Sequence, residues 1–342
     1  MQTVAKRVNF MLRWPWDTSR TGDPPDKGED GERVELDTTS TIGWIGAGRM
    51  GSEMIGRLLD AGYQVSVYNR TRAKASALLD RGAKIVESVG DLSAADAVFV
   101  TVSSSEDFVE VMLGDEGLLS RLSIPSVVVD SSTVAVEASE KVREAVRARG
   151  SMLLAAPVSG NPRVAAAGKL TMAVSGPAEA YKMVAPLLDA IGNGSTYVGD
   201  GDLARLVKLC HNLFLGVVMQ SVSEITVLAE RGGVNRATFL SYLNKSVMGS
   251  MFTGYKAPAV VNLDFEPTFT SKLLRKDFDL GLAAARALEV PMPVAGLVHQ
   301  LVQQLVGEGY GDDDFATLIK LVAQGAHLQL VSENVQVNDG LS

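Results

Sequence analysis

The chain has 342 residues, of which 46% are hydrophobic and 21% charged, and this composition is typical of a globular protein with a large core. Its 32 lysines and arginines against 40 acids give a net charge of −8, which argues against nucleic acid as the main partner. The single cysteine, Cys210, excludes an intramolecular disulfide, and three histidines offer little for a metal site, so we expect a metal-free protein of a reducing compartment, the cytoplasm.

Residues 1–40 stand apart from the rest of the chain. The first 20 are basic and carry one acid, Asp17, whereas residues 21–40 are polar and rich in proline and glycine. Such a composition cannot bury enough apolar surface to fold, so we expect a disordered or dispensable extension. An N-terminal targeting peptide is the alternative, although no apolar core or clear cleavage site follows the basic residues.

The folded protein is expected to start at Thr41 with a strand over residues 41–45, a glycine-rich turn, a helix over residues 53–62 and a second strand over residues 64–69. The turn has the GxGxxG spacing between a strand and a helix, the context of a dinucleotide fingerprint. Gly46 permits the tight turn, Gly48 lets the backbone approach the pyrophosphate, and Gly51 allows close packing. The expected cofactor contacts in this turn are Gly46, Ala47, Gly48, Arg49 and Met50.

The end of the second strand favours NADP(H) over NAD(H). An NAD site wants an acid there for the ribose 2′-hydroxyl, but this chain has Asn69, Arg70 and Thr71, followed by Arg72 and Lys74. An arginine fork and a threonine hydroxyl suit a 2′-phosphate. A solvated helix start is the alternative, although cations at a helix N-terminus oppose its dipole unless an anion is bound.

Apolar segments then alternate with helical ones, a pattern that predicts a doubly wound parallel sheet covered on both faces. The loops that leave the expected strands carry Ser103, Ser104 and Thr133 at the carboxyl ends, where such sheets bind ligands, so we assign these residues to the cofactor. The expected strands span residues 83–86, 96–102, 126–130 and 151–157, with a helix over 134–149 and added edge strands over 169–175 and 195–198.

Residues 202–233 form the stretch around which the chain is organised. They contain no proline, Asp202 can cap a helix start, and Gly232 and Gly233 can end it. A helix of this length is about 45 Å long and apolar almost all round, so we expect burial on most sides. Charged residues, among them Arg205 and Lys208, argue against a membrane span.

Beyond Gly233 no strand pattern persists, and the second half is expected to be all-α. Helices are expected over residues 237–246, 272–289, 294–306 and 313–330, separated by Pro258, Pro267, Pro291 and Pro293. The expected organisation is therefore an extension (1–40), a Rossmann domain (41–201), an interdomain helix (202–233), an all-α domain (234–332) and a tail (333–342).

Four motifs in order resemble the β-hydroxyacid dehydrogenase family, which includes 3-hydroxyisobutyrate dehydrogenase and the glyoxylate and succinic semialdehyde reductases. GWIGAGRMG matches the cofactor signature, APVSG (156–160) the substrate loop, KLCHN (208–212) the catalytic motif KxxNN, and KDFDLGLAAA (276–285) the motif KDLxLA. The resemblance covers about residues 41–330.

This resemblance implies an NAD(P)-dependent oxidoreductase that interconverts a short β-hydroxy acid and its semialdehyde or keto form. Lys208 would be the catalytic acid and base, because a lysine ammonium stabilises a developing alkoxide and can donate its proton. Ser159, Gly160 and Asn212 would position the carboxylate substrate, with Asn161 beside them, and Lys276 would reach the cofactor. Like the family members, the chain would form a homodimer or homotetramer.

The chain departs from the family pattern at Ala155, at Asn161-Pro162 and at His211, and these departures bear on the identity of the substrate, not on the reaction class. His211 points about 100° away from Asn212 on the helix and is expected to serve packing or support. Two alternatives stay open: an imine reductase or reductive aminase of the same fold, which usually carries Asp or Tyr in place of Lys208, and a non-catalytic NADP-binding scaffold or sensor.

Overall fold

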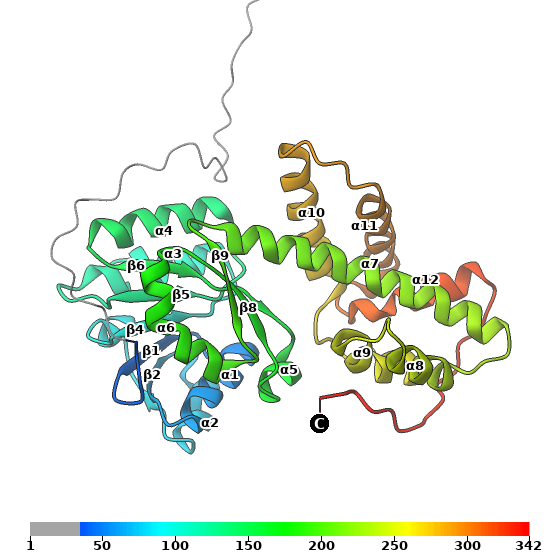
Figure 1. The fold of residues 1–342 in the computed structure, drawn as a ribbon, viewed down its shortest axis with the longest axis horizontal. Helices are drawn as coiled ribbons and strands as arrows, with labels where there is room; N and C mark the ends of the chain where they lie inside the picture. Colours follow the sequence, from blue (N-terminus) through cyan, green and yellow to red (C-terminus); the bar gives the residue numbers. More distant parts are fainter. Residues whose placement is uncertain (1–34, 342) are drawn as a thin grey trace, which may run out of the picture.

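The computed structural model describes residues 35–341, so most of the expected N-terminal extension lies outside the described residues. An α/β lobe and an all-helical lobe lie side by side, and helix α7 (Leu203–Arg231) runs from the first along the second (Figure 1). The predicted fold class is confirmed: a Rossmann-type sheet, a long connecting helix and a helical C-terminal part.

The α/β lobe is built on one nine-stranded sheet. Its strands are β1 (Thr41–Ile45), β2 (Gln64–Tyr68), β3 (Lys84–Ile85), β4 (Ala97–Val100), β5 (Val127–Asp130), β6 (Met152–Ala155), β7 (Val158–Ser159), β8 (Thr171–Ser175) and β9 (Ser195–Gly199). The order is β3-β2-β1-β4-β5-β6-β8-β7, with β9 paired to β8. All pairs from β3 to β6 are parallel, as predicted, whereas β8 runs antiparallel to β6 and β7.

Helices cover both faces of this sheet, which is why its central strands are buried and almost wholly apolar. Trp44 and Phe99 stack at 4.9 Å in one core, whereas Ile45 and Val98 face the other, because side chains alternate along a strand. The helical segments of this lobe are α1 (Arg49–Asp60), η1 (Arg72–Ala75), α2 (Ser76–Leu79), η2 (Val89–Leu92), α3 (Ser105–Leu113), η3 (Leu118–Ser120), α4 (Val136–Ala148), α5 (Pro162–Ala166) and α6 (Ala178–Ile191).

Helix α7 confirms the predicted long helix, and Gly232 with the left-handed Gly233 (φ +92°) ends it. Two expectations about it are wrong. The Asp202 side chain does not cap the helix, because it is held by arginines instead. The helix is also not buried on most sides within one chain: Phe214 is 67% and Leu228 73% exposed.

The helical lobe packs around α7 and contains one helix that the sequence analysis did not predict. Pro258, expected to separate two helices, lies inside α9; burial of its neighbours Ala257, Val260 and Val261 outweighs the loss of one backbone hydrogen bond. The helical segments are α8 (Arg236–Lys245), α9 (Met251–Asn262), α10 (Ser271–Ala287), α11 (Pro293–Leu305), η4 (Val306–Tyr310), η5 (Phe315–Thr317) and α12 (Leu318–Gly325).

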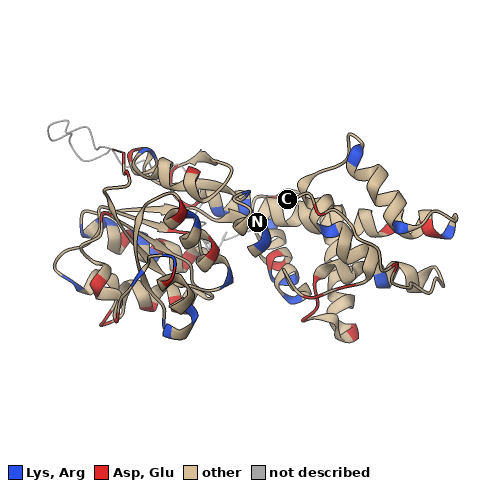
Figure 2. Ribbon diagram, turned by 90° about the horizontal axis from the view of Figure 1, so that it is seen from below, with Lys and Arg blue, Asp and Glu red and all other residues tan. Residues whose placement is uncertain are grey.

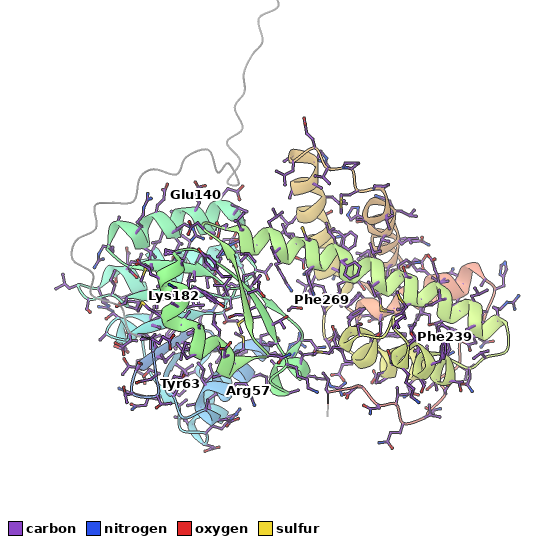
Figure 3. All side chains as sticks on the ribbon, viewed as in Figure 1. Arg57, Tyr63, Glu140, Lys182, Phe239 and Phe269 are labelled. Atoms are coloured by element: carbon purple, nitrogen blue, oxygen red, sulfur yellow. The ribbon has the colours of Figure 1, made fainter. Side chains whose placement is uncertain are left out.

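The expected helix over residues 313–330 is much shorter than predicted, because only α12 and the turn η5 are helical there. Asp314 caps η5 through its carboxylate and forms a buried ion pair with Lys256. Phe269 packs edge-on against Phe315 beside this pair, on the side of the helical lobe that faces the α/β lobe (Figure 3).

The last residues form an extended tail that returns to the α/β lobe. Glu333 accepts hydrogen bonds from the N–H groups of Arg236 and Ala237 at the start of α8. Farther along, Lys169 donates to the carbonyl oxygen of Leu341 at 3.0 Å. Figure 1 shows this tail on the side of the molecule opposite to α7, so the two lobes are joined on two sides.

Candidate functional site

The turn between β1 and α1 has the geometry that a dinucleotide requires. Gly46 has a φ of +99°, and a Cβ on it would lie 2.1 Å from the carbonyl oxygen of Thr101, so the turn needs glycine. A Cβ on Gly51 would lie 2.1 Å from the Gly46 oxygen, which explains the third glycine. A Cβ on Gly48 would meet no atom within 4 Å, and no side chain caps α1. Open space and uncapped N–H groups fit a cofactor pyrophosphate.

The residues at the end of β2 hold this turn and present cations to solvent. The Asn69 side-chain oxygen accepts a hydrogen bond from Ala47 N–H at 2.8 Å, and its amide donates to the Thr71 carbonyl at 2.7 Å. Arg70 is largely exposed and pairs with Asp107 at 2.7 Å. A phosphate at this position would therefore compete with the Asp107 carboxylate for the guanidinium.

Two further arginines, Arg72 and Arg49, lie near this turn and make contacts of their own. Arg72 pairs with Glu87 and lines a surface hollow together with Ala73, Ser76, Leu79 and Ile85. Arg49, in the glycine-rich turn, donates to the Pro267 carbonyl oxygen of the helical lobe at 3.1 Å. The turn therefore makes contact with both lobes, whereas Met50 packs against the core beneath it.

The hydroxyl residues expected at the cofactor differ in what they do. Ser103 and Thr133 are exposed at the carboxyl ends of β4 and β5. The Ser104 hydroxyl accepts a hydrogen bond from Asp107 N–H and thereby caps α3. Ser104 therefore has a structural task, whereas Ser103 and Thr133 remain available for a ligand.

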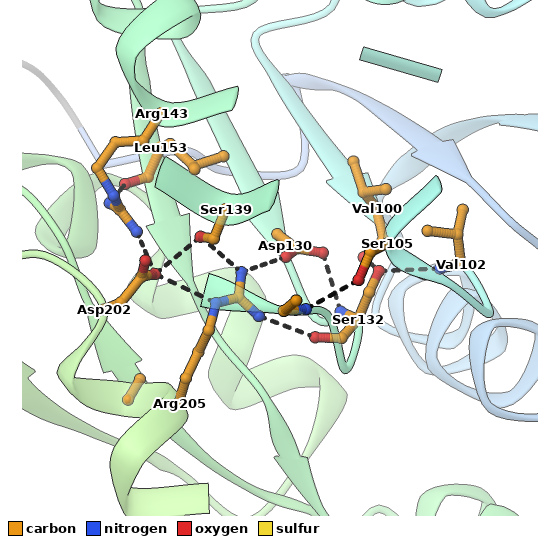
Figure 4. Close-up of polar contacts among 12 residues, drawn as sticks. Val100, Val102, Ser105, Asp130, Ser132, Ser139, Arg143, Leu153, Asp202 and Arg205 are labelled. Carbon is orange, nitrogen blue, oxygen red and sulfur yellow. Dashed lines mark hydrogen bonds and ion pairs between the residues drawn. The ribbon is translucent and has the colours of Figure 1, made fainter. Parts of the chain in front are cut away.

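A buried polar cluster ties the start of α7 to the loop after β5 (Figure 4). Arg205 donates to the carboxylate of Asp130 at 2.5 Å, to the carbonyl oxygen of Ser132 at 3.1 Å and to Asp202 at 3.2 Å. Burial opposes the charge on Arg205, but the two carboxylates outweigh burial and raise its pKa. Asp202 also accepts hydrogen bonds from Ser139 and Arg143.

The same cluster holds the two loops at the sheet edge together. Ser132 Oγ accepts a hydrogen bond from Val102 N–H at 2.9 Å, and Ser105 Oγ accepts one from Ala135 N–H at 2.9 Å (Figure 4). The loops after β4 and β5 are thus fixed to each other and, through Arg205, to α7.

Lys208 lies one turn after Arg205 on α7. Burial of its ammonium group lowers the pKa of Lys208 from 10.5 to about 8, although the charge of Asp277 on α10 opposes this shift. No hydrogen bond from residues 35–341 reaches its amine. A lysine that titrates near neutral pH and keeps its donors free is suited to proton transfer.

A chain of hydrogen bonds runs beside Lys208, from the substrate loop to α10. Ser159 Oγ lies 2.8 Å from His211 Nε2, His211 Nδ1 lies 2.9 Å from Asn212 Oδ1, and Asn212 Nδ2 donates to Asp277 at 2.5 Å. Burial raises the pKa of Asp277 by more than the hydrogen bond from Asn212 and the charges of Lys208 and Lys276 lower it, so the pKa is raised on balance. The structure thus brings together the predicted residues Ser159, Lys208 and Asn212.

His211 supports Ser159 and Asn212, in keeping with the supporting role expected for it, but its direction was not predicted, and Asp277 was not predicted as a site residue. His211 was expected to point away from Asn212, but an imidazole is long enough to reach both its neighbour and the loop at Ser159. Asp277 stands next to Lys276 in the motif KDFDLG, which was the available signal. Lys276 itself is exposed on α10.

Asn161 and Pro162 have a local structural explanation. The Asn161 side-chain oxygen caps α5 by accepting a hydrogen bond from Val164 N–H at 3.0 Å, and Pro162 takes the first helical position, where no N–H is needed. Gly160 before them has a φ of +131°, and a Cβ there would crowd Val164 and Leu170. The departure from the family loop therefore starts a short helix.

The described residues show no single-sign charged surface in Figure 2 and no cluster of metal ligands, and one helix is long and apolar enough to span a membrane. Acidic and basic residues are interspersed over both lobes (Figure 2). Within residues 35–341 no group of three His, Cys, Asp or Glu side chains could hold a metal ion. In the same range, α7 alone is long and apolar enough to cross a membrane, but half of its most apolar stretch is buried against the protein, as in a core helix.

Comparisons with known proteins agree on both halves of the chain. Residues 41–199 match the family described as the NAD binding domain of 6-phosphogluconate dehydrogenase. Residues 203–322 match the family described as the NAD-binding domain of NADP-dependent 3-hydroxyisobutyrate dehydrogenase. Together the two matches span nearly all of residues 41–332, the part of the chain expected to fold.

Comparison with individual proteins also finds dehydrogenases and reductases that are similar over most of the chain. An NAD-dependent L-serine dehydrogenase from Pseudomonas aeruginosa is 31% identical over 82% of this chain and 97% of its own. The chloroplastic glyoxylate/succinic semialdehyde reductase 2 of Arabidopsis thaliana is 30% identical over 84% of this chain and 80% of its own. The crystal structure of 3-hydroxyisobutyrate dehydrogenase from Salmonella typhimurium has a TM-score of 0.74 and 26% identity over 82% of this chain and 99% of its own.

Proposed function

The chain belongs to the β-hydroxyacid dehydrogenase family, and we propose that it interconverts a short β-hydroxy acid and its semialdehyde or keto form with NADP(H), using Lys208 as the general acid and base. The family supports NAD(P)-dependent dehydrogenase activity on the hydroxyl groups of hydroxy acids. The observation that carries the choice of Lys208 is its place on α7, one turn before Asn212 and close enough to Asp277 to feel its charge, where burial lowers its pKa to about 8.

The proton chemistry follows from the position of Lys208. The bound nicotinamide would supply the hydride in reduction and accept it in oxidation. In reduction, the Lys208 ammonium donates a proton to the carbonyl oxygen as that oxygen becomes an alkoxide; in oxidation, the neutral amine removes the hydroxyl proton. Asp277 stabilises the ammonium form and fixes Asn212, so the residues beside the lysine keep their orientation.

The preference for NADP(H) is proposed from the end of β2. Arg70 and Thr71 are exposed there and Asn69 replaces the acid that an NAD site uses. One relative is NAD-dependent by name, and one matching family is NADP-dependent, so the relatives do not decide between the cofactors. In Arg70→Ala the KM for NADPH should rise, while the KM for NADH should change little.

A second copy of the chain is the proposed partner, because apolar side chains such as Phe214 and Leu228 are exposed along α7. Placement in the cytoplasm also stays a prediction, and one relative is chloroplastic. Cell fractionation of the full chain and of a form without residues 1–40 would test it.

The decisive experiment follows NADPH oxidation against glyoxylate, succinic semialdehyde, tartronate semialdehyde and methylmalonate semialdehyde, with cyclic imines included. Turnover of a carbonyl acid should be lost in Lys208→Ala, while NADPH binding persists. Lys272→Ala is the matched control, since Lys272 pairs with Asp312 on the surface. Turnover of imines alone would assign the chain to reductive amination, and unchanged turnover in Lys208→Ala would exclude the lysine mechanism.

A further inference from the structure

The orientation of the Asn212 amide fixes the direction of the hydrogen-bond chain beside Lys208. An ionised carboxylate can only accept hydrogen bonds, so the Asn212 NH₂ group must face Asp277, 2.5 Å away. The Asn212 oxygen therefore faces His211 Nδ1, 2.9 Å away. An amide oxygen can only accept, so Nδ1 must carry a proton and donate it to Asn212.

The protonation state of His211 then decides what the Ser159 hydroxyl can do. In neutral His211 the single ring proton is on Nδ1, so Nε2 is an acceptor and Ser159 must donate its proton to it across 2.8 Å. The serine then offers only lone pairs to a ligand. In protonated His211, Nε2–H donates to Ser159 Oγ, and the hydroxyl proton becomes free to bind a ligand acceptor.

A substrate carboxylate needs a donor, and this requirement couples it to His211. We propose that His211 sets the donor or acceptor role of Ser159, so that binding of a carboxylate at Ser159 is accompanied by uptake of one proton at His211. The proposal rests on the proposed function only in placing the substrate carboxylate at Ser159. His211 is thus a positioning residue that controls affinity, and it takes no part in the proton transfer assigned to Lys208.

The charges around the ring define the pH range of this effect. Burial and the positive charge of Lys208, on the same helix, lower the pKa of His211 below 6.5, and the hydrogen bond with Asn212 opposes them. Asp277 on α10 is linked to the His211 ring by hydrogen bonds through Asn212. From β7 the ring is contacted by the Ser159 hydroxyl, which does not titrate. His211 is therefore neutral in the free protein at pH 7, and the lysine titrates at a higher pH, near 8.

Steady-state kinetics test the coupling. In the wild-type enzyme, KM for the carbonyl acid should rise by up to about tenfold for each pH unit above the pKa of His211, until the pKa of the substrate complex is passed. In His211→Gln this slope should vanish, because an amide can donate to Ser159 at every pH. His299→Gln is the matched control, since His299 bonds Asp279 on the surface, and it should keep the slope. A flat wild-type profile, or an equal slope in His211→Gln, would overturn the proposal.

An NMR titration of the full-length protein tests it without turnover. The chain has three histidines, so the Cε1–H signal of His211 can be assigned by its loss in His211→Gln. Malonate, an unreactive carboxylate, should raise the pKa of His211 in the wild type and leave it unchanged in Ser159→Ala. Malonate binding without a pKa shift in the wild type refutes the coupling. A shift in a protein that turns over no carbonyl acid would retain the coupling and reject the proposed reaction, whereas failure to bind malonate would reject the carboxylate site and the coupling with it.

Discussion

The ion pair between Arg205 and Asp130 allows a quantitative test of how α7 is anchored. The two side chains are 5% and 0% exposed, and with Arg143 and Asp202 they form a cluster of two cations and two carboxylates. Asp130→Asn keeps the shape of the side chain but leaves one positive charge in excess. Breaking a buried pair from one side costs about 3–5 kcal/mol, and since Asp202 stays bound to Arg205 we expect about 3 kcal/mol.

A double-mutant cycle separates the pair from its surroundings. Urea unfolding followed by circular dichroism gives the free energy of unfolding for the wild type, Asp130→Asn, Arg205→Met and the double variant. Each single variant should lose about 3 kcal/mol, and the double variant should lose about 2–3 kcal/mol less than the sum of the two. Asp60→Asn, which breaks the exposed pair with Arg81, is the control and should lose less than about 1 kcal/mol.

Additive losses in the double variant would refute the reasoning, because they would mean that each residue acts on stability without the other. A loss in Asp130→Asn as small as that of the surface control would refute it as well, since a buried guanidinium would then tolerate the missing carboxylate.

Three further predictions concern the site and the surface. Reduction should slow about tenfold for each pH unit above about 8, because protonated Lys208 is lost. Oxidation needs the neutral amine, so it should speed up as the pH rises toward about 8 and then level off; parallel profiles in the two directions would contradict this assignment. Gly46→Ala should abolish nucleotide binding in a fluorescence titration, whereas Gly82→Ala, with a positive φ but no close neighbour, should bind normally. Phe214→Glu should lower the sedimentation coefficient if α7 meets a second copy, and Leu122→Glu, on the other lobe, should not; an unchanged value for Phe214→Glu would reject this face as the interface.

Local patterns explain how much of the fold could be predicted. The turn from Gly46 to Gly51 lies between one strand and one helix, so its spacing alone carries the geometry, and the long helix was found from composition and its terminal glycines. Pro258 was misleading because its breaking effect is local, whereas burial of Val260 and Val261 is a property of the packed lobe.

The candidate site was only partly predictable for a similar reason. Lys208 was found because the motif KLCHN lies within five consecutive residues and can be read directly from the sequence. The bond between Ser159 and His211 joins residues 52 positions apart, and the bond between Asn212 and Asp277 joins residues 65 apart. No periodicity in the sequence encodes such distances. Asp202 was mispredicted for the same reason. Aspartate often caps a helix, but here its carboxylate pairs with Arg143 and Arg205, and folding brings Arg143 close to it.

The C-terminal tail, which returns to the α/β lobe, adds a second connection between the two lobes. Helix α7 connects the two lobes covalently. On the opposite side the extended tail connects them a second time, through a hydrogen bond from Lys169 and an ion pair with Arg163. Two connections on opposite sides restrict bending and twisting of one lobe relative to the other more than α7 alone would. The described end of the tail lies beside α5, because Asp339 pairs with Arg163 of that helix and Leu341 accepts a hydrogen bond from Lys169, so a substitution at Asp339 would weaken this second connection between the lobes.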